Sequence, residues 1–426
     1  MIFITILLIC LILLGVPIAF ALGVCSVLFI IFSDIPLSFI AHQMVITNEQ
    51  GFSMLAIPFF VFVGELMNQG EITDRIFSFC KSLVGHIRGG LAYVNILDSM
   101  IFAGMSGSAV ADVSGLGMIE YEVMVKNKYD PEFSAALTGA TAVIGPIIPP
   151  SIPMVIFGVM AQVSIARLFI GGFFPGVLLG LSMMAMVYFY AGARKYPKET
   201  RASIRQILKE FYRTFLALLL PVFMLLGISL GVTSVTEAGI IADIYALILS
   251  GFIYQTLTVS KLIDIFRRTF DITARIMFII LTASVFGWIV THEQMITPAL
   301  DWIKEIGVSP WVVLLLFNIL LLILGCVMES IAIMLIVGPF IIPVVSSMGI
   351  SLVHFGVVMV LNLMIGLMTP PFGLLIFLLQ DITGLSAKKI IMASIPFIVI
   401  MIGVLLLVTY FPFLTTWLPN LIFGVE

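Results

Sequence analysis

Gly-Pro-Ile-Ile-Pro-Pro-Ser at residues 145–151 and Gly-Leu-Met-Thr-Pro-Pro-Phe-Gly at residues 366–373 decide the fold of this chain. In both stretches the proline pair follows the glycine at the same spacing, inside a long apolar run. Proline lacks a backbone N–H and breaks a helix. Irregular backbone at membrane depth survives only where protein covers it or where it lines a wet cavity. Two breaks at equivalent positions therefore predict the binding site of a secondary transporter built from two repeats.

The composition places the chain in a membrane. Of its 426 residues, 61% are hydrophobic and 10% are charged, and the mean hydropathy is +1.24. We therefore predict an all-α, multi-pass membrane protein whose first segment is retained and not cleaved as a signal peptide. No Walker A sequence is present, so we expect no ATP hydrolysis by this chain. We also expect it to be no enzyme and to have no nucleic-acid partner. The cysteines lack metal-ligand spacing, and we expect all of them to be buried small hydrophobes: Cys10, Cys25, Cys80 and Cys326.

The second half of the sequence repeats the order of segments found in the first. Each half has a run with small and polar residues at its middle, which suggests a re-entrant helical hairpin, followed by a proline-broken span and a further span. Pro175 and Pro396 follow the two proline pairs at the same offset. If each half crosses the membrane an odd number of times, the halves are inverted repeats. The segments are 1–32 (one kinked helix or two, interrupted at 15–17), 52–67, 71–88, 91–125, 133–160 and 165–190, then 215–232, 238–256, 261–275, 276–290, 311–345, 353–379 and 390–413.

We assign the segments to two parts, a scaffold and a transport domain, each contributed by both halves. The amphipathic stretches 71–88 and 261–275 are expected to lie at the membrane interfaces and to hold the scaffold. The only strongly basic loop lies mid-chain, and the positive-inside rule places it in the cytoplasm, with both chain ends periplasmic. The assigned parts are 1–90 and 214–308 for the scaffold, 91–192 and 309–426 for the transport domain, and 193–213 for the basic loop.

The first candidate site lies where residues 104–112 meet the broken stretch 145–151. Na⁺ is a hard cation that needs several oxygen ligands. Glycines and serines permit a tight hairpin tip that exposes carbonyls and hydroxyls, and the proline break frees carbonyls that a continuous helix would use. Small residues also permit close helix packing, but their repetition in the other half favours an ion site.

The second half offers a matching set around the second break. Its members are Asn362, Gly366 and Thr369 on one helical face, opposite Gly325, Glu329 and Ser330. A carboxylate inside a membrane segment indicates function by default, so Glu329 and Asp112 are candidates, with a structural ion pair or a helix cap as the alternative. Three further acids fit a polar scaffold interface and are left out of the site: Asp98, Glu237 and Asp243.

Gly104-Met105-Ser106-Gly107-Ser108-Ala109 in a hairpin, the stretch 145–151 and Thr369-Pro370-Pro371 resemble the large membrane subunit of tripartite ATP-independent periplasmic (TRAP) transporters. The resemblance covers essentially the whole chain. It implies an elevator-type transporter of the bacterial inner membrane, in which the hairpins and broken helices carry the substrate and the coupling ion Na⁺. It also implies two partners, a small four-helix membrane subunit and a soluble periplasmic substrate-binding protein.

The resemblance also implies the substrate class. Substrates of the family are mostly organic acid anions, and the chain is similar to the sialic-acid members. Half-helix N-termini after Pro150 and Pro371 would offer positive dipole ends to a carboxylate, which suits C4-dicarboxylates equally well. The candidate substrate-binding residues are Ser106, Ser108, Asp112, Pro150, Ser151, Glu329 and Ser330. The candidate Na⁺ ligands are Ser106, Ser108, Gly145, Gly325, Glu329, Gly366, Met368 and Thr369.

Two other classes of protein share part of this pattern. A stand-alone dicarboxylate/Na⁺ symporter has the same layout of hairpins and breaks but works without partners. An ion channel or a flippase has no need for paired breaks and alternating access. We therefore expect Na⁺-coupled uptake of an organic acid anion, with sialic acid as the first candidate.

Overall fold

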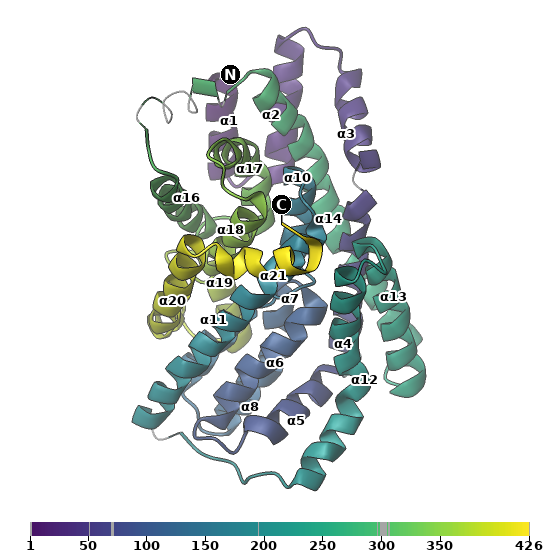
Figure 1. The fold of residues 1–426 in the computed structure, drawn as a ribbon, viewed down its shortest axis with the longest axis vertical. Coiled ribbons are helices and arrows are strands. Elements are labelled where there is room, and N and C mark those ends of the chain that lie inside the picture. Colours follow the sequence, from purple (N-terminus) through teal and green to yellow (C-terminus); the bar gives the residue numbers. More distant parts are fainter. Residues whose placement is uncertain are drawn as a thin grey trace.

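A computed structural model describes residues 2–50, 52–69, 72–194, 196–295, 297–298, 305 and 307–425. Within these ranges the regular secondary structure is helical, with no strand, and six helices are long and apolar enough to cross a membrane. A helix satisfies its backbone hydrogen bonds internally, as a bilayer requires. The prediction of an all-α, multi-pass membrane protein is confirmed (Figure 1).

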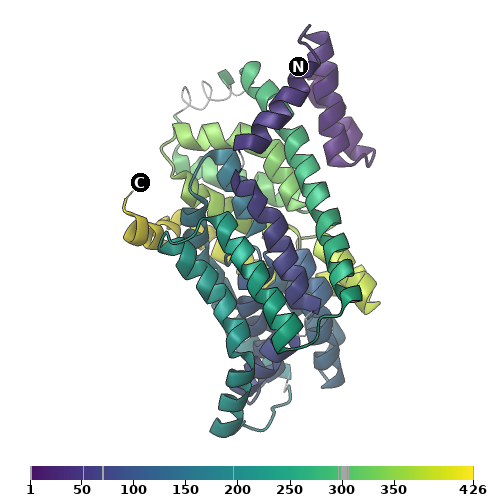
Figure 2. The same ribbon diagram turned by 90° about the vertical axis from the view of Figure 1, so that its right-hand side faces the viewer.

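The first apolar segment forms two helices. α1 (Ile2–Leu13) ends before Gly15, whose φ of +79° is left-handed, and Pro17 precedes α2 (Ile18–Phe32). A further helix follows, α3 (Ser38–Gln50), which the sequence analysis did not predict. These N-terminal helices lie at one end of the molecule (Figure 2).

One expectation about the cysteines is wrong. Cys10 on α1 is exposed, whereas the other three cysteines are buried. The buried face of α1 carries Ile4 and Leu8, and Cys10 lies off that face. The pattern of apolar residues is uniform along α1, so the sequence did not indicate which side would be covered.

Besides α1 to α3, five helices of the described residues lie in the part of the fold that was assigned to the scaffold. Residues 261–275 and 276–290 were predicted as an interfacial stretch and a separate span, and this is wrong, because one continuous helix covers both. No proline or glycine separates the two stretches. The segment 72–84 is an amphipathic helix as predicted, with Ile72, Ile76 and Cys80 buried, and residue 71 lies outside the described part. The helices are α4 (Ala56–Gln69, after a turn at Phe52–Leu55), α5 (Ile72–Val84), α12 (Ile204–Ser229), α13 (Val235–Ile248, continued as a π-helical turn at Leu249–Ile253) and α14 (Val259–His292).

The two predicted hairpins and the two broken helices are present. Figure 1 shows the first hairpin (α6 and α8) in the lower half of the molecule and the second (α16 and α17) in the upper half, so their tips approach the middle from opposite ends. The first half comprises α6 (Gly90–Ser106), α7 (Ala109–Asp112), a π-helical turn (Val113–Gly117), α8 (Met118–Lys126), the broken pair α9 (Pro131–Ala142) and α10 (Ile152–Ala161), and α11 (Ile165–Arg194). The second half comprises α16 (Pro310–Gly325), α17 (Ser330–Ser347), the broken pair α18 (Leu352–Gly366) and α19 (Leu374–Thr383), and α20 (Ala387–Tyr410).

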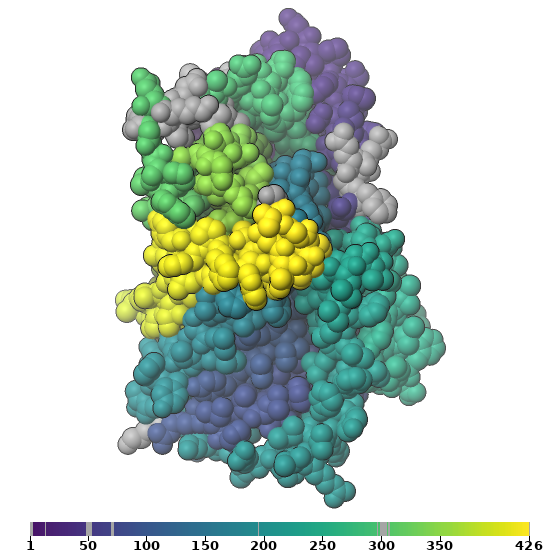
Figure 3. Space-filling model, viewed as in Figure 1, coloured from purple at the N-terminus to yellow at the C-terminus, as the bar shows by residue number. Residues whose placement is uncertain are grey.

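The chain does not end with α20. After a turn at Pro412 it continues as α21 (Phe413–Phe423), which packs on α11 and, with α20, crosses the middle of one face of the molecule (Figure 3). Arg167 of α11 holds α21 by donating hydrogen bonds to Asn420 Oδ1 at 3.4 Å and to the Phe423 carbonyl at 3.3 Å.

The basic mid-chain connection is shorter than predicted. α12 begins at Ile204, so the second part of the predicted loop is helical, and residue 195 lies outside the described part. The remaining connection is tied to the end of α5 by an ion pair between Lys81 Nζ and Glu199 Oε1 at 2.9 Å.

Candidate functional site

The tip of the first hairpin gathers hydroxyls and a carboxylate. Gly107 takes a φ of +59°, a left-handed conformation that glycine adopts without strain. Ser108 then caps α7, because its Oγ accepts a hydrogen bond from the Ala111 N–H at 3.4 Å. Ser106 Oγ donates to Asp112 Oδ1, while Asp112 Oδ2 has no hydrogen-bond partner among the described residues.

The first broken helix packs against this tip through its backbone. A Cβ added to Gly107 would lie 2.7 Å from the Pro150 carbonyl oxygen. A Cβ on Gly145 would collide with the Asp112 carboxylate. Only glycine permits these approaches, so the predicted meeting of 104–112 with 145–151 is confirmed.

The tip of the second hairpin is built on Glu329. This residue precedes α17, and its Oε2 accepts a hydrogen bond from the Ala332 N–H at 3.4 Å. Ser330 Oγ donates to Glu329 Oε1 at 3.4 Å. Behind the tip, Gly325 lies against Gly366, where an added Cβ would come within 2.6 Å of the Gly325 Cα.

The two tips correspond in detail. Ser108 and Glu329 each cap the returning helix of their hairpin with a side-chain oxygen. The second tip also reaches its own break, since the Gly373 N–H donates to the Cys326 carbonyl at 3.0 Å. The bond between the two prolines is cis in both breaks. The repeat read from the sequence therefore extends to the roles of individual residues.

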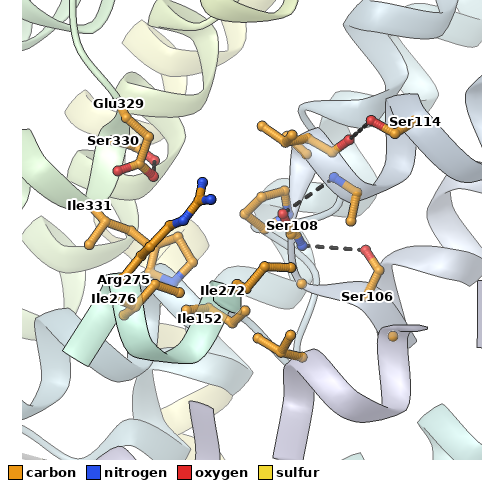
Figure 4. Close-up of a pocket in the computed structure, with 18 of the residues that line it drawn as sticks. Ser106, Ser108, Ser114, Ile152, Ile272, Arg275, Ile276, Glu329, Ser330 and Ile331 are labelled. Atoms are coloured by element: carbon orange, nitrogen blue, oxygen red, sulfur yellow. Dashed lines mark hydrogen bonds between the residues drawn. The ribbon is translucent and has the colours of Figure 1, made fainter. Parts of the chain in front are cut away.

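Both tips line one cavity of about 600 Å³ (Figure 4). Its other walls come from α4 and α14 and from the two broken helices, so it lies between the transport-domain elements and the helices assigned to the scaffold. The volume falls within the range of small-molecule sites. Its polar and glycine lining comes from Ser106, Gly107, Ser108, Ser114, Glu329 and Ser330 on the hairpins and from Gly64, Glu65, Arg268, Asp271 and Arg275 on α4 and α14.

Arg275 is one of the cavity residues that the sequence analysis missed, together with Glu65, Arg268 and Asp271. It extends into the cavity on the side of Glu329 and Ser330 (Figure 4), and it forms no hydrogen bond or ion pair with any described residue. Arg268, which lies two helical turns earlier on α14, forms an ion pair with Glu65, with Nη1 at 3.9 Å from Oε2. The signal was available, because an arginine in a membrane helix indicates function, but the stretch 261–275 had been assigned to the interface.

The predicted site residues fall into two groups. Four line the cavity: Ser106, Ser108, Glu329 and Ser330. The others do not line it: Asp112, Gly145, Pro150, Ser151, Gly325, Gly366, Met368 and Thr369. Ser151 Oγ is engaged within the break, where it donates to the Pro146 carbonyl at 2.5 Å, and Thr369 Oγ1 donates to the Ile365 carbonyl at 2.8 Å. The carbonyl oxygens of Gly145 and Met368 accept no hydrogen bond from the described part of the chain.

A buried asparagine joins each hairpin to its broken helix. In the first half, Asn95 donates to Thr138 Oγ1 at 3.0 Å and accepts from Thr141 Oγ1 at 2.7 Å. In the second half, Asn362 Nδ2 donates to Asn318 Oδ1 at 2.8 Å. The polar residues of α9 and α18 that lead to the two breaks therefore hold each broken helix against its hairpin.

Other polar residues have structural roles. Glu237, which the sequence analysis left outside the site, forms a capping box with Ser234 at the start of α13. His354 is buried, with Nδ1 at 2.8 Å from Thr415 Oγ1, and joins α18 to α21.

Replacing Gly366 with alanine is expected to destabilise the protein. The added methyl group would meet the Gly325 backbone at 2.6 Å, and backbone moves less readily than a side-chain end. Overpacking of this kind costs about 1–3 kcal/mol. Gly403→Ala is the matched control, because nothing lies within 4 Å of its added Cβ and alanine favours a helix. Thermal unfolding of the purified proteins gives the melting temperatures of both variants. Equal melting temperatures of the Gly366→Ala and Gly403→Ala variants would contradict the close contact.

The opposed hairpins, the paired breaks and the cavity between them define a helical membrane transporter of the secondary type. A family model described as the DctM component of the tripartite ATP-independent periplasmic transporter matches residues 5–414. The sialic acid TRAP transporter large permease SiaM of Vibrio cholerae is 42% identical over 411 residues, which are 96% of each chain. The C4-dicarboxylate TRAP transporter large permease DctM of Pseudomonas aeruginosa is 38% identical over 391 residues, which are 92% of this chain and 91% of the relative.

The chain therefore belongs to the DctM family of TRAP transporter large permeases. It is a multi-pass protein of the bacterial inner membrane and a transporter, not an enzyme. Among solved structures, the YdaH transporter of Alcanivorax borkumensis is similar with a TM-score of 0.61 at 15% identity, covering 88% of each chain. That likeness concerns the fold alone.

Proposed function

We propose that this permease uses a Na⁺ gradient to take up an organic acid anion, with sialic acid as the first candidate and C4-dicarboxylates as the second. The observation that carries the proposal is the single cavity shared by two oxygen-rich hairpin tips and the unpaired Arg275. The relatives named for sialic acid and for C4-dicarboxylates have similar identity to this chain, so the choice between these substrates rests on the modest difference between 42% and 38%.

The anion is expected to bind against Arg275. A guanidinium presents a rigid set of donors that matches a carboxylate in two parallel hydrogen bonds. Because Arg275 has no partner among the described residues, no existing ion pair must be broken before a substrate carboxylate binds it. Arg268 is less available, since Glu65 already faces it at 3.9 Å.

Na⁺ is expected to bind at the two tips, behind the substrate. The first tip supplies Ser106, Ser108 and the free oxygen of Asp112, and the breaks supply carbonyls such as those of Gly145 and Met368. Hydroxyl, carboxylate and carbonyl oxygens are the ligands that a hard cation prefers. A cation at each tip would also offset the negative charge of Asp112 and Glu329.

We infer two protein partners from the family and from the name of large permease that its relatives carry. One is a small membrane subunit that packs on the scaffold, and the other is a periplasmic protein that delivers the substrate. The transport domain then moves against the scaffold between two positions, which gives alternating access to the cavity.

Uptake by the reconstituted three-part system tests this function. Proteoliposomes with both membrane subunits receive the binding protein together with labelled sialic acid or labelled succinate, with and without a Na⁺ gradient. Saturable, Na⁺-dependent uptake of sialic acid is expected. Uptake of succinate but not of sialic acid would show that C4-dicarboxylates are the substrates. Uptake by this chain without its partners would contradict the tripartite function and indicate a stand-alone symporter. Saturable uptake in a fixed ratio to Na⁺ would exclude an ion channel or a flippase.

Removing a hydroxyl from either tip or break is expected to weaken Na⁺ binding. Ser108→Ala deletes an oxygen at the first tip and Thr369→Ala one at the second break. We expect the contact between a hydroxyl oxygen and Na⁺ to contribute as much as a hydrogen bond between neutral groups, about 0.5–1.5 kcal/mol. The Na⁺ concentration for half-maximal uptake should therefore rise about two- to tenfold. Ser182→Ala on α11, whose hydroxyl bonds its own helix at 2.8 Å, is the control. Unchanged Na⁺ dependence in both variants would indicate that Ser108 and Thr369 only allow close packing and do not bind Na⁺.

A further inference from the structure

Two buried carboxylates lie inside the first hairpin, apart from the cavity. Asp98 is on α6 and Glu120 on α8, the two arms of the hairpin, and their exposed fractions are 0% and 1%. Neither residue lines the cavity. They are close enough to interact electrostatically with one another and with the Cys80 thiol on α5.

The two carboxylates lack hydrogen-bond donors. Both oxygens of Asp98 and Oε1 of Glu120 have no partner among the described residues. An ionised carboxylate taken out of water without a partner is so unfavourable that such a group becomes neutral in practice. Two neighbouring carboxylates are worse, because like charges also repel one another.

No cation of the described helices packed around the pair forms an ion pair with it; α12, which packs against α5 and α6, carries Arg205 and Lys209 without ion pairs, but both are exposed. The other groups that act on it are acidic, Asp74 on α5 and Asp112 on α7. No described lysine, arginine or histidine forms an ion pair with Asp98 or Glu120. The charged groups of the surrounding helices that have partners are engaged elsewhere: Arg75 over the Tyr254 ring at 3.8 Å, Lys81 with Glu199, Lys126 with Glu122, Arg194 with Asp130, Arg213 with Glu210, and the acids Glu65 with Arg268 and Glu132 with Lys389.

A proton is the ligand that fits this place. The described residues contain no group of three or more histidine, cysteine, aspartate or glutamate side chains arranged to hold a metal ion. We propose that Asp98 and Glu120 form a proton-binding site within the first hairpin, which holds at least one proton while exposed carboxyl groups of the same chain are ionised. The bound proton lowers the charge buried where α6 packs against α5. If the hairpin moves as proposed above, the proton also reduces the charge that must cross the bilayer, but the site itself does not depend on that function.

Infrared spectroscopy of the full-length chain in lipid nanodiscs tests the site without a transport assay. At neutral pH the carbonyl stretch of protonated carboxyl groups should lose intensity in Asp98→Asn or in Glu120→Gln. Glu122→Gln is the matched control, because Glu122 lies two residues away on α8, is exposed and is paired with Lys126; its variant should leave the band unchanged. An amide has the shape of a protonated carboxyl, so both variants should fold and melt near the wild-type temperature.

Three results would overturn the proposal. The first is a band of unchanged intensity in both variants. The second is failure of both amide variants to fold, which would mean that the ionised forms are required. The third is a melting temperature that rises with Na⁺ in the wild type but not in the variants, which would assign a cation, and not a proton, to the pair.

Discussion

Oxidation of a Gly287→Cys/Pro339→Cys variant is expected to stop uptake. Gly287 lies on α14, in the part assigned to the scaffold, and Pro339 lies on α17, in the second hairpin. A Cβ on Gly287 would lie 3.9 Å from the Cβ of Pro339, which is the separation that a disulfide needs. If the second hairpin moves against α14 during transport, the disulfide holds the hairpin in one of its two positions. Uptake should fall to background in the oxidised protein and return on reduction.

A cysteine-free background and a control disulfide make this result specific. The four native cysteines are replaced by alanine first, because Cys25 and Cys326 lie in the regions under study. Gly23→Cys/Thr282→Cys joins α2 to α14, where an added Cβ on Gly23 lies 3.6 Å from Thr282 Cγ2, and it crosses no boundary between the two parts. Its oxidation should leave uptake intact. Normal uptake by fully oxidised Gly287→Cys/Pro339→Cys protein would rule out the elevator motion.

Local chemistry explains which features of the fold could be predicted. Proline and glycine act on the backbone at their own positions, so the two breaks and the tip at Gly107 followed from residue type and spacing alone. The repeat strengthened this reading, because it placed Glu329 at the same position in its hairpin as Ser108.

Features that depend on tertiary contacts could not be predicted in the same way. α3 and α21 are short helices with little apolar periodicity, and α21 is held by contacts with α11 that are distant in sequence. The exposure of Cys10 depends on which side of α1 is covered. The placement of Arg275 required the knowledge that α14 is continuous and passes both hairpin tips, since the basic residues before it resemble an interfacial stretch.

Replacing Arg275 is expected to have a large effect on substrate affinity. Arg275→Gln keeps much of the side-chain length but removes the charge that a substrate carboxylate would meet in the cavity. Hydrogen bonds to charged groups are worth about 1.5–3 kcal/mol, so the substrate concentration for half-maximal uptake should rise about 10- to 100-fold. Arg275→Lys should be impaired as well, because an ammonium cannot form the paired hydrogen bonds of a guanidinium. Uptake of labelled sialic acid by the reconstituted system, at fixed Na⁺, measures these changes.

Arg267→Gln is the matched control for this experiment. Arg267 lies on the same helix, is exposed and does not line the cavity, so its replacement removes one positive charge from α14 without changing the site. Its half-maximal substrate concentration should stay near the wild-type value. Arg268→Gln should fall between the two, because Arg268 lines the cavity but already faces Glu65. Equal effects of Arg267→Gln and Arg275→Gln would show that α14 contributes only a general positive field, and the anion would then have to bind at the helix N-termini of the broken helices.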